Sequence, residues 1–294
     1  MKVAILGCGY IGLELARQLQ PDHEVVGVRR SEAGIEAIEE TGATAVQADV
    51  TDAEELADVP TADAVVFAAS SGGRDAEAAR EVYVEGLRTA IDHFCERTPA
   101  PDRFVYTSST GVYGDHDGEW VDEDTPIEPT TDKTEVLAEA ERIARERPIG
   151  DTDGTVARFA GLYGPERYRL ERYVEGPVTE GYLNMVHRAD AAGSVRFLLE
   201  ADVARRQVVN VVDDEPVSKW AFADWLAEQC GEPEPEKRTK AERLEEAGLS
   251  EAAKRRIQTS KRVSNDRLRE LGYEFEYPTY KAGYRAAVEA YRGE

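Results

Sequence analysis

The chain has 294 residues, of which 41% are hydrophobic, so it is long and apolar enough to bury a core. It carries 59 acidic against 36 basic residues, and its formal net charge of −23 repels phosphate backbones and anionic lipid surfaces. We therefore expect no nucleic-acid partner and no membrane partner. No run approaches the roughly 20 apolar residues of a transmembrane helix, and the N-terminal apolar stretch is too short for a signal peptide, so a cytoplasmic location is expected.

The cysteine and lysine contents further narrow the class of protein. Cys8, Cys95 and Cys230 are odd in number and lack paired ligand spacing, which excludes a disulfide scaffold, and we assign no metal. Only eight of the 36 basic residues are lysine. Scarce lysine with excess carboxylate resembles proteins of salt-in halophiles such as haloarchaea, in which multimolar salt screens self-repulsion. An ordinary acidic cytosolic protein is the alternative.

The first half of the chain alternates short β-branched runs with helical patterns, which is typical of a parallel α/β sheet. Strands are predicted over residues 2–6, 24–29, 43–47, 64–68, 103–108, 154–160 and 208–212. Helices are predicted over residues 10–20, 31–40, 75–97 and 133–147. The connection 111–131, rich in Asp, Gly and Pro, exceeds ordinary loop lengths, and such loops are usually functional.

After residue 161 the alternation of strand and helix weakens. Further helices are predicted over residues 189–201, 218–230, 241–247 and 278–291. The mixed-charge stretch 237–262 is interpreted as a solvated helical face. This half indicates a smaller, mostly helical lobe added to the sheet.

The strongest motif follows the first predicted strand and opens the first predicted helix. It reads Gly7-Cys8-Gly9-Tyr10-Ile11-Gly12. In this context the glycines permit a tight turn, close approach of a pyrophosphate and close packing of helix on strand, while the helix N-terminus offers N–H groups to the phosphates. We therefore predict dinucleotide binding; the alternative is a glycine-rich turn without a ligand. Cys8 is interpreted as a spacer, or as an oxidation-sensitive thiol if the helix N-terminus stabilises its thiolate.

The end of the second predicted strand favours one cofactor. Arg29 and Arg30 stand where NAD-binding proteins place an acidic residue, and the planar guanidinium suits a 2′-phosphate. We therefore predict NADP(H) over NAD(H), although two surface arginines paired with carboxylates are the alternative. Asp49 is expected to contact the adenine or to cap a helix. The predicted cofactor contacts after the third and fourth strands are Asp49, Val50, Ala68 and Ala69.

These patterns together predict a Rossmann-like, doubly wound parallel sheet of the α/β class with a smaller, mostly helical C-terminal substrate lobe. The NAD(P)-binding domain is expected to comprise residues 1–161 and 185–215. The substrate lobe is expected to comprise residues 162–184 and 216–294.

Several further motifs follow in order along the chain. Residues 106–114 read Tyr-Thr-Ser-Ser-Thr-Gly-Val-Tyr-Gly, residues 158–165 read Arg-Phe-Ala-Gly-Leu-Tyr-Gly-Pro, and residues 184–190 read Asn-Met-Val-His-Arg-Ala-Asp. With the glycine turn, they resemble the extended short-chain dehydrogenase/reductase superfamily, the NAD-dependent epimerase/dehydratase group. The resemblance covers most of the chain.

The resemblance implies roles for particular residues. Ser109 would stand beside the reacting carbon of the substrate, and Tyr163, Asn184 and His187 would lie near the substrate. It also implies a homodimer, formed through the helices predicted over 75–97 and 133–147.

The chain departs from this family at the catalytic Tyr-x-x-x-Lys pair. Matching Pro129 and Glu141 to the family's flanking residues puts Lys133 at the tyrosine and Leu137 at the lysine. Keeping Lys133 as the lysine puts Pro129 at the tyrosine instead. Neither register gives the pair, so the chain resembles an atypical member.

Three side chains are candidates for the missing proton donor. Lys133 could serve if desolvation brought its titration nearer neutrality, but a solvated surface lysine is the alternative. Tyr113 and His187 could also serve, and for both a packing role is the alternative. Ser109, Lys133 and Tyr113 form the predicted catalytic set.

The sequence therefore predicts an NADP(H)-dependent oxidoreductase or epimerase that acts by hydride transfer on a small carbonyl- or hydroxyl-bearing substrate, a class that includes sugar nucleotides. A non-catalytic NADP(H)-binding redox sensor or regulatory protein is the alternative. A structural homologue without cofactor is the third hypothesis.

Overall fold

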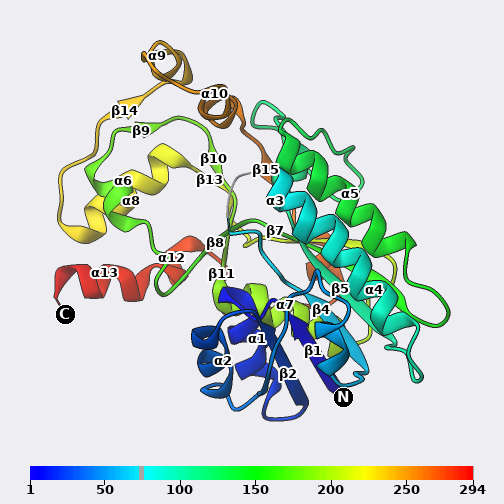
Figure 1. The fold of residues 1–294 in the computed structure, drawn as a ribbon. Helices are drawn as coiled ribbons and strands as arrows, with labels where there is room; N and C mark the ends of the chain where they lie inside the picture. Colours follow the sequence, from blue (N-terminus) through cyan, green and yellow to red (C-terminus); the bar gives the residue numbers. More distant parts are fainter. Residues whose placement is uncertain (73–75, 294) are drawn as a thin grey trace. The chain divides into compact units, whose positions relative to one another are not determined.

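The computed structural model describes residues 1–72 and 76–293, and the chain divides into two compact units (Figure 1). Unit 1 consists of Met1–Val112, Asp132–Phe159 and Ala191–Val209. Unit 2 consists of Tyr113–Thr131, Ala160–Asp190 and Asn210–Glu294. Most of the long connection 111–131 thus groups with unit 2, whereas the sequence assigned it to the cofactor-binding domain.

The large sheet has seven strands in the order β12-β7-β5-β4-β1-β2-β3. All neighbours run parallel, and the order reverses direction beside β1, which is where doubly wound sheets bind ligands. This arrangement confirms the predicted Rossmann-like α/β fold. The strands are β1 (Lys2–Leu6), β2 (Glu24–Arg29), β3 (Thr44–Gln47), β4 (Ala64–Phe67), β5 (Arg103–Ser109), β7 (Asp153–Phe159) and β12 (Val208–Val211).

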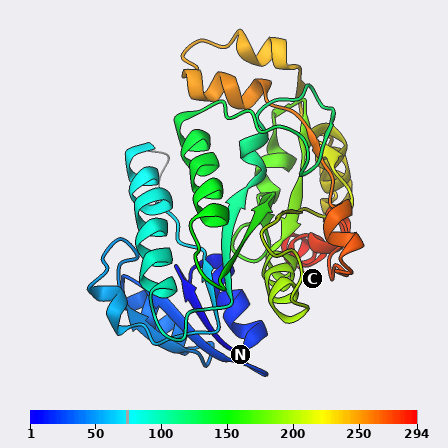
Figure 2. The same ribbon diagram turned by 90° about the vertical axis from the view of Figure 1, so that its right-hand side faces the viewer.

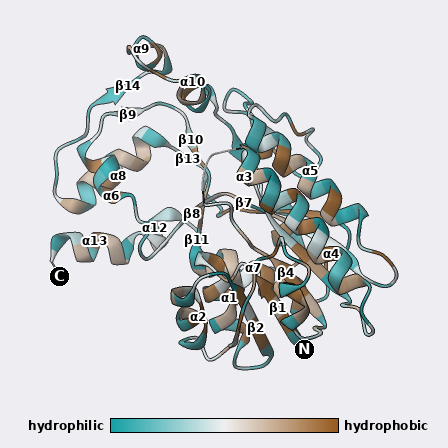
Figure 3. Cartoon of the chain, in the orientation of Figure 1, coloured by the Kyte–Doolittle hydropathy of each residue, from teal (hydrophilic) through white to brown (hydrophobic). Residues whose placement is uncertain are grey.

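The central strands form the core of unit 1. Val3–Leu6 and Ala64–Phe67 are fully buried, and Figure 3 shows β1 and β2 in hydrophobic colours. Parallel strands covered by helices on both faces favour such continuous apolar runs. The flanking elements are α1 (Tyr10–Leu19), α2 (Glu32–Glu39), η1 (Glu55–Asp58), η3 (Thr110–Tyr113), α5 (Asp132–Glu146) and α7 (Arg188–Glu200), which begins in unit 2.

The helix predicted over 75–97 contains a widened turn. Residue 75 lies outside the described residues. Helix α3 (Ala76–Arg80) continues into the π-helical segment η2 (Glu81–Gly86) and then into α4 (Leu87–Cys95). Helical backbone angles persist through the junctions, so the direction of the helix is kept, and Figure 2 shows it beside α5. Such π-helical turns are frequent at functional sites.

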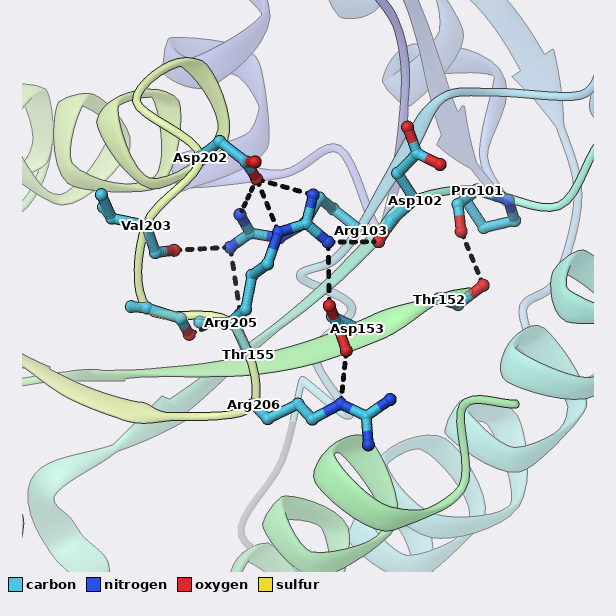
Figure 4. Close-up of polar contacts among 11 residues, drawn as sticks. Pro101, Asp102, Arg103, Thr152, Asp153, Thr155, Asp202, Val203, Arg205 and Arg206 are labelled. Carbon is cyan, nitrogen blue, oxygen red and sulfur yellow. Dashed lines mark hydrogen bonds and ion pairs between the residues drawn. The ribbon is translucent and has the colours of Figure 1, made fainter. Parts of the chain in front are cut away.

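A network of charged side chains ties the amino ends of β5 and β7 to the turn after α7 (Figure 4). Buried Arg103 donates to Asp202 at 2.8 Å, to the carbonyl of Val203 at 2.8 Å and to Thr155 at 3.1 Å. Arg205 bridges Asp202 and Asp153, each at 2.9 Å, and Arg206 also pairs with Asp153. We call Arg103, Asp153, Asp202, Arg205 and Arg206 the amino-edge network.

Unit 2 combines short two-stranded pairs with helices. The pairs are β6 (Trp120–Val121) with β15 (Arg262–Val263), β8 (Gly161–Tyr163) with β11 (Met185–His187), β9 (Val178–Thr179) with β14 (Lys237–Arg238), and β10 (Tyr182–Leu183) with β13 (Val217–Ser218). The helices are α6 (Leu170–Glu175), α8 (Lys219–Cys230), α9 (Lys240–Leu244), α10 (Glu251–Gln258), α11 (Asp266–Glu270), α12 (Tyr280–Gly283) and α13 (Arg285–Arg292).

Two predictions for unit 2 need correction. The helix predicted over 278–291 is divided into α12 and α13 at Tyr284, which is buried in an aromatic cluster. The stretch 237–262 is not one solvated face, because it starts in β14 and ends in β15. Within it, Lys261 is 7% exposed and its ammonium donates to the carbonyl of Gly114 at 2.7 Å, a contact that charge patterning does not reveal.

Within residues 1–72 and 76–293, no helix combines the length and the apolar character needed to cross a membrane. The same residues contain no cluster of three His, Cys, Asp or Glu side chains that could hold a metal ion.

Candidate cofactor and reaction site

The glycine turn joins β1 to α1 and is shaped by close backbone contacts. Gly7 has φ +83°, and a Cβ atom there would lie 2.2 Å from Ala69 Cα, so only glycine allows the turn to press against the segment after β4. A Cβ atom at Gly12 would lie 3.1 Å from Ile5 Cγ2, so this residue brings α1 close to β1. Ala68 donates its N–H to the carbonyl of Leu6 at 2.8 Å. The residues predicted to cradle the cofactor are thus assembled around the end of β1.

The start of α1 is suited to an anion. The N–H groups of Gly7 and Cys8 donate to the carbonyl of Val28 at 3.1 and 3.0 Å, which holds the turn against β2. Helix α1 begins at Tyr10, followed by Ile11, and its N-cap Gly9 has no side chain to cap it. The first turn of a helix has backbone N–H groups without intrahelical partners, and the helix dipole adds positive potential there. A phosphate group matches this geometry.

The thiol of Cys8 is enclosed in this turn. Cys8 is fully buried, and its sulfur lies 3.0 Å from the position of a Cβ at Gly27. Burial raises the pKa of this thiol to about 12, and Arg29 and Arg17 offset only part of the effect. The structure therefore favours the spacer interpretation, because the stabilised thiolate that oxidation sensitivity would require is not indicated.

The two arginines at the end of β2 have different environments. Arg29 is half-buried and donates to the carbonyl of Cys8 at 3.1 Å, so its guanidinium lies at the glycine turn. Arg30 is exposed and pairs with Asp49 at 3.1 Å, which matches the paired-arginine alternative. Asp49 also accepts from the backbone and hydroxyl of Thr51 at 3.0 and 2.8 Å. Burial alone would raise the pKa of Asp49, but the hydrogen bonds of Thr51 and Arg30 outweigh it and lower that pKa. Buried Val50 lies next in the chain.

Ser109 ends β5, beside the first turn of α5. Its hydroxyl accepts from the N–H of Gly111 at 3.1 Å. A Cβ atom at Gly111 would lie 3.3 Å from Ser109 Oγ and 3.7 Å from Thr134 Cγ2. The sequence-predicted pair Ser109 and Lys133 therefore comes from two segments that meet at the carboxyl end of the sheet.

A buried ion pair holds α5 on the sheet behind Ser109. Arg158 on β7 donates to Glu141 on α5 at 2.6 and 3.0 Å, and Ser108 donates to the same carboxylate at 2.6 Å. Both charged side chains are almost fully buried. In the sequence, Glu141 served only to align the helix. The available signal for the ion pair was its negative charge together with the positive charge of Arg158 in the motif at 158–165.

The remaining predicted site residues belong to unit 2. Tyr113 is fully buried and donates its hydroxyl to Asn210 at 2.9 Å, which favours the packing interpretation. Asn184 donates to the carbonyl of Lys261 at 2.9 Å and accepts from the N–H of Val263 at 2.7 Å. Its amide thus positions β15.

Tyr163 and His187 lie in the aromatic cluster of unit 2. The ring of Tyr163 stacks on Tyr284 at 4.9 Å between centroids and meets His187 edge-on at 5.3 Å. His187 Nε2 lies 3.5 Å from the hydroxyl of Tyr168, and its Nδ1 accepts from the backbone of Ala189. Burial raises the pKa of Tyr163 far above its usual range. Both residues contribute to the packing of this unit.

One residue at the carboxyl edge of unit 1 was missed by the sequence analysis. Tyr83, in η2, has its ring 5.8 Å from the ammonium of Lys133 and its hydroxyl 3.4 Å from the backbone N–H of Ser71. In the sequence, the helical spacing of Tyr83 predicts only that it lies on the buried face of its helix. Its neighbours in space come from residues 71 and 133, so no local signal identified it.

Comparisons with known proteins agree with this geometry. A family model described as NAD(P)H-binding matches residues 7–202. Protein YeeZ of Escherichia coli K12 is 30% identical over 289 residues, which cover 94% of this chain and 96% of YeeZ.

Solved structures with the same fold agree with these sequence comparisons. A protein of Methylobacillus flagellatus, described as a candidate NAD-dependent epimerase/dehydratase, is 31% identical with a TM-score of 0.76, covering 100% of this chain and 99% of that one. Human epimerase family protein SDR39U1, solved with NADPH, is 21% identical with a TM-score of 0.78 over 98% and 99% of the two chains and shares the fold. Because the family model spans the glycine turn and most of the large sheet, this chain belongs to the NAD(P)H-binding family.

Proposed function

We propose that this protein is an NADP(H)-dependent oxidoreductase or epimerase that acts on a small carbonyl- or hydroxyl-bearing substrate, with sugar nucleotides as the first class to test. The observation that carries the proposal is the preformed glycine turn with Arg29 beside it and Ser109 at the end of β5. The Methylobacillus relative supports the epimerase/dehydratase class, and the NADPH of the human structure supports the cofactor.

The residues present fit such a cofactor. The backbone around Gly7 and Gly9 and the start of α1 would hold the pyrophosphate, and Arg29 and Arg30 would face the 2′-phosphate. When bound, the nicotinamide supplies or accepts a hydride. Ser109 would donate a hydrogen bond to the substrate oxygen.

A thermal-shift titration in molar KCl with NADPH, NADP, NADH and NAD tests the proposal. A ligand that binds only the folded state stabilises it by about 2.7 kcal/mol at a hundredfold excess over its Kd. We expect NADPH and NADP to raise the melting temperature more than NADH and NAD do. A folded sample that none of the four stabilises would contradict the proposal.

The same samples test the proposed adaptation to salt. With a net charge of −23, self-repulsion is screened only weakly in dilute buffer. We expect the circular dichroism of the folded protein to be lost as KCl is removed. A melting temperature that does not change with KCl would show an ordinary acidic protein.

A further inference from the structure

A tyrosine and a lysine from two different helices meet at the carboxyl edge of unit 1. Tyr83 lies in the π-helical turn between α3 and α4, with 8% of its surface exposed. Lys133 lies in the first turn of α5, and its ammonium is 5.8 Å from the centre of the Tyr83 ring. Ordinary helix positions 50 residues apart are thus brought into contact by packing.

This contact lies where the predicted cofactor and reaction residues come together. The hydroxyl of Tyr83 accepts from the backbone N–H of Ser71 at 3.4 Å, and Ser71 follows Ala69 by two residues. Ala69 packs directly on Gly7 in the glycine turn. On the other side, Lys133 is followed by Thr134. A Cβ atom at Gly111 would lie close to both Thr134 and Ser109, so these two side chains border the same space. The segments that carry the pair therefore border both Gly7 and Ser109.

The local electrostatics lower the pKa of the Tyr83 phenol. Burial alone would raise the pKa of Tyr83, but the polar groups of Ser70 and Ser71 and the positive charge of Lys133 outweigh burial and lower that pKa. Buried Tyr106 on β5 shows the opposite effect, because burial and Glu141 raise its pKa.

Within residues 1–72 and 76–293, the charge that lowers the pKa of the Tyr83 phenol is that of Lys133, from α5. Tyr83 in turn acts on the buried phenol of Tyr106 on β5, whose pKa Glu141 also raises. Glu141 is paired with Arg158.

We propose that Tyr83 is the proton donor and acceptor of the reaction, with Lys133 as its positioning residue, in place of the Tyr-x-x-x-Lys pair that neither register around Lys133 provides. The inference rests on the proposed function. In the reducing direction, the carbonyl carbon gains the hydride of the reduced nicotinamide. The carbonyl oxygen gains the proton of the Tyr83 hydroxyl, whose O–H bond breaks to leave a phenolate. Water then returns a proton to the phenolate, and the reverse reaction takes the substrate hydroxyl proton onto it.

The decisive experiment is an NMR pH titration of protein labelled with 13C at the tyrosine Cζ, with and without NADPH. Tyr83→Phe assigns the resonance. We expect Lys133→Met to raise the pKa of Tyr83 by about 1 or more, as for loss of a nearby opposite charge. Lys240→Met, which changes a lysine in the first turn of α9, is the matched control and should leave it unchanged. A Tyr83 resonance that does not respond to Lys133→Met overturns the proposal.

Turnover gives a second, independent readout. The probes are UDP-glucose and dTDP-glucose with NADP, and small aldehydes and ketones with NADPH. We expect Tyr83→Phe to lower kcat by about 100-fold or more while the Kd for NADPH stays unchanged. Tyr291→Phe, at an exposed tyrosine in α13, should retain full rate. Full activity of Tyr83→Phe overturns the proposal.

The two proposals can fail separately. If NADPH does not bind, the proposed function fails, but the NMR titration still reports whether Lys133 acts on Tyr83. If NADPH binds and Tyr83 does not respond to Lys133, the proposed function stands and the proton donor must be sought elsewhere.

Discussion

At the amino ends of β5 and β7, Arg103 is buried against Asp202, Thr155 and a backbone carbonyl, and Arg205 and Arg206 close the cluster (Figure 4). At the carboxyl ends of the same sheet, the hydroxyl of Ser109 and the backbone N–H groups at the start of α1 are groups that can hydrogen-bond a ligand. At the amino edge, the charged side chains form ion pairs with one another. The carboxyl edge keeps hydrogen-bonding capacity where strands of an open sheet bind ligands. Changes at the amino edge should therefore affect stability alone, whereas changes at the carboxyl edge can also affect cofactor binding.

The largest loss of stability is expected when the buried ion pair that supports the carboxyl edge is broken. Glu141→Ala leaves the Arg158 guanidinium without its carboxylate in a dry interior, and should lower the free energy of unfolding by about 3–5 kcal/mol. Urea denaturation in molar KCl measures it. Glu146→Ala, at the exposed end of the same helix, should cost under about 0.5 kcal/mol. Equal losses for the two variants would show that the pair is not a buried support.

Gly7→Ala should reduce both stability and cofactor binding. Its positive φ costs about 1–2 kcal/mol for a residue with a Cβ, and the clash with Ala69 adds to this. Gly231→Ala has a similar φ of +74° with nothing within 4 Å of its Cβ, so it should show only the backbone cost. Chemical denaturation and an NADPH thermal shift measure the two effects. NADPH stabilisation that survives in Gly7→Ala would contradict the role of the turn.

Arg103→Met should lower stability without affecting the cofactor. The variant loses buried hydrogen bonds to Thr155 and to the carbonyl of Val203, which suggests about 2 kcal/mol. Because Asp202 is exposed, it can be hydrated after the change. The Kd for NADPH, measured by fluorescence, should be that of the wild type. A weakened Kd would show that the two edges are coupled.

Arg30→Ala should act on binding alone. Because Arg30 is exposed and pairs with Asp49 on the surface, the free energy of unfolding should change by less than about 1 kcal/mol. Loss of a charge-assisted contact to a 2′-phosphate should weaken NADPH binding about tenfold and leave NADH unchanged. Isothermal titration with the two cofactors tests this. Equal weakening of both would remove the argument for NADP(H).

The smallest expected effect is a pH dependence of the amino edge. Arg206 and Arg205 lower the pKa of Asp153, and Arg205 and Arg103 lower that of Asp202. Their stabilisation is present above the unfolded pKa of about 3.9 and is lost as pH falls through the lower folded values. Arg205→Met should therefore reduce the stability difference between pH 5 and pH 3. An unchanged pH profile would show that these exposed pairs contribute nothing measurable.

Much of the fold follows from local sequence. The apolar run of β1, the glycine turn and the start of α1 lie within twelve residues, so their pattern predicts the strand, the turn and the helix together. The parallel pairing of the large sheet follows from the repeated alternation of strand and helix, whereas the strand order was not predicted. The π-helical turn η2 was not predicted, because a widened turn keeps nearly the same apolar periodicity as the helix around it.

The candidate site depended more on tertiary structure. The sequence alone was sufficient to identify some site residues, because the motifs that mark them consist of residues adjacent in the chain. These residues are Gly7, Gly9, Arg29 and Ser109. Lys261 looked solvated among charged neighbours, yet packing buries it against the carbonyl of Gly114. A residue's burial depends on segments far away in the chain, which periodicity does not encode.

By itself, the sequence determined the Rossmann-like class and the place of the glycine turn, because both arise from interactions between residues close in the chain. Only the tertiary structure decided that Tyr83 meets Lys133 and that Glu141 pairs with Arg158. Each of these pairs joins residues 17 to 50 positions apart, carried by different elements. Which of many possible partners they meet is set by the packing of helices on the sheet, and that packing is a property of the whole unit.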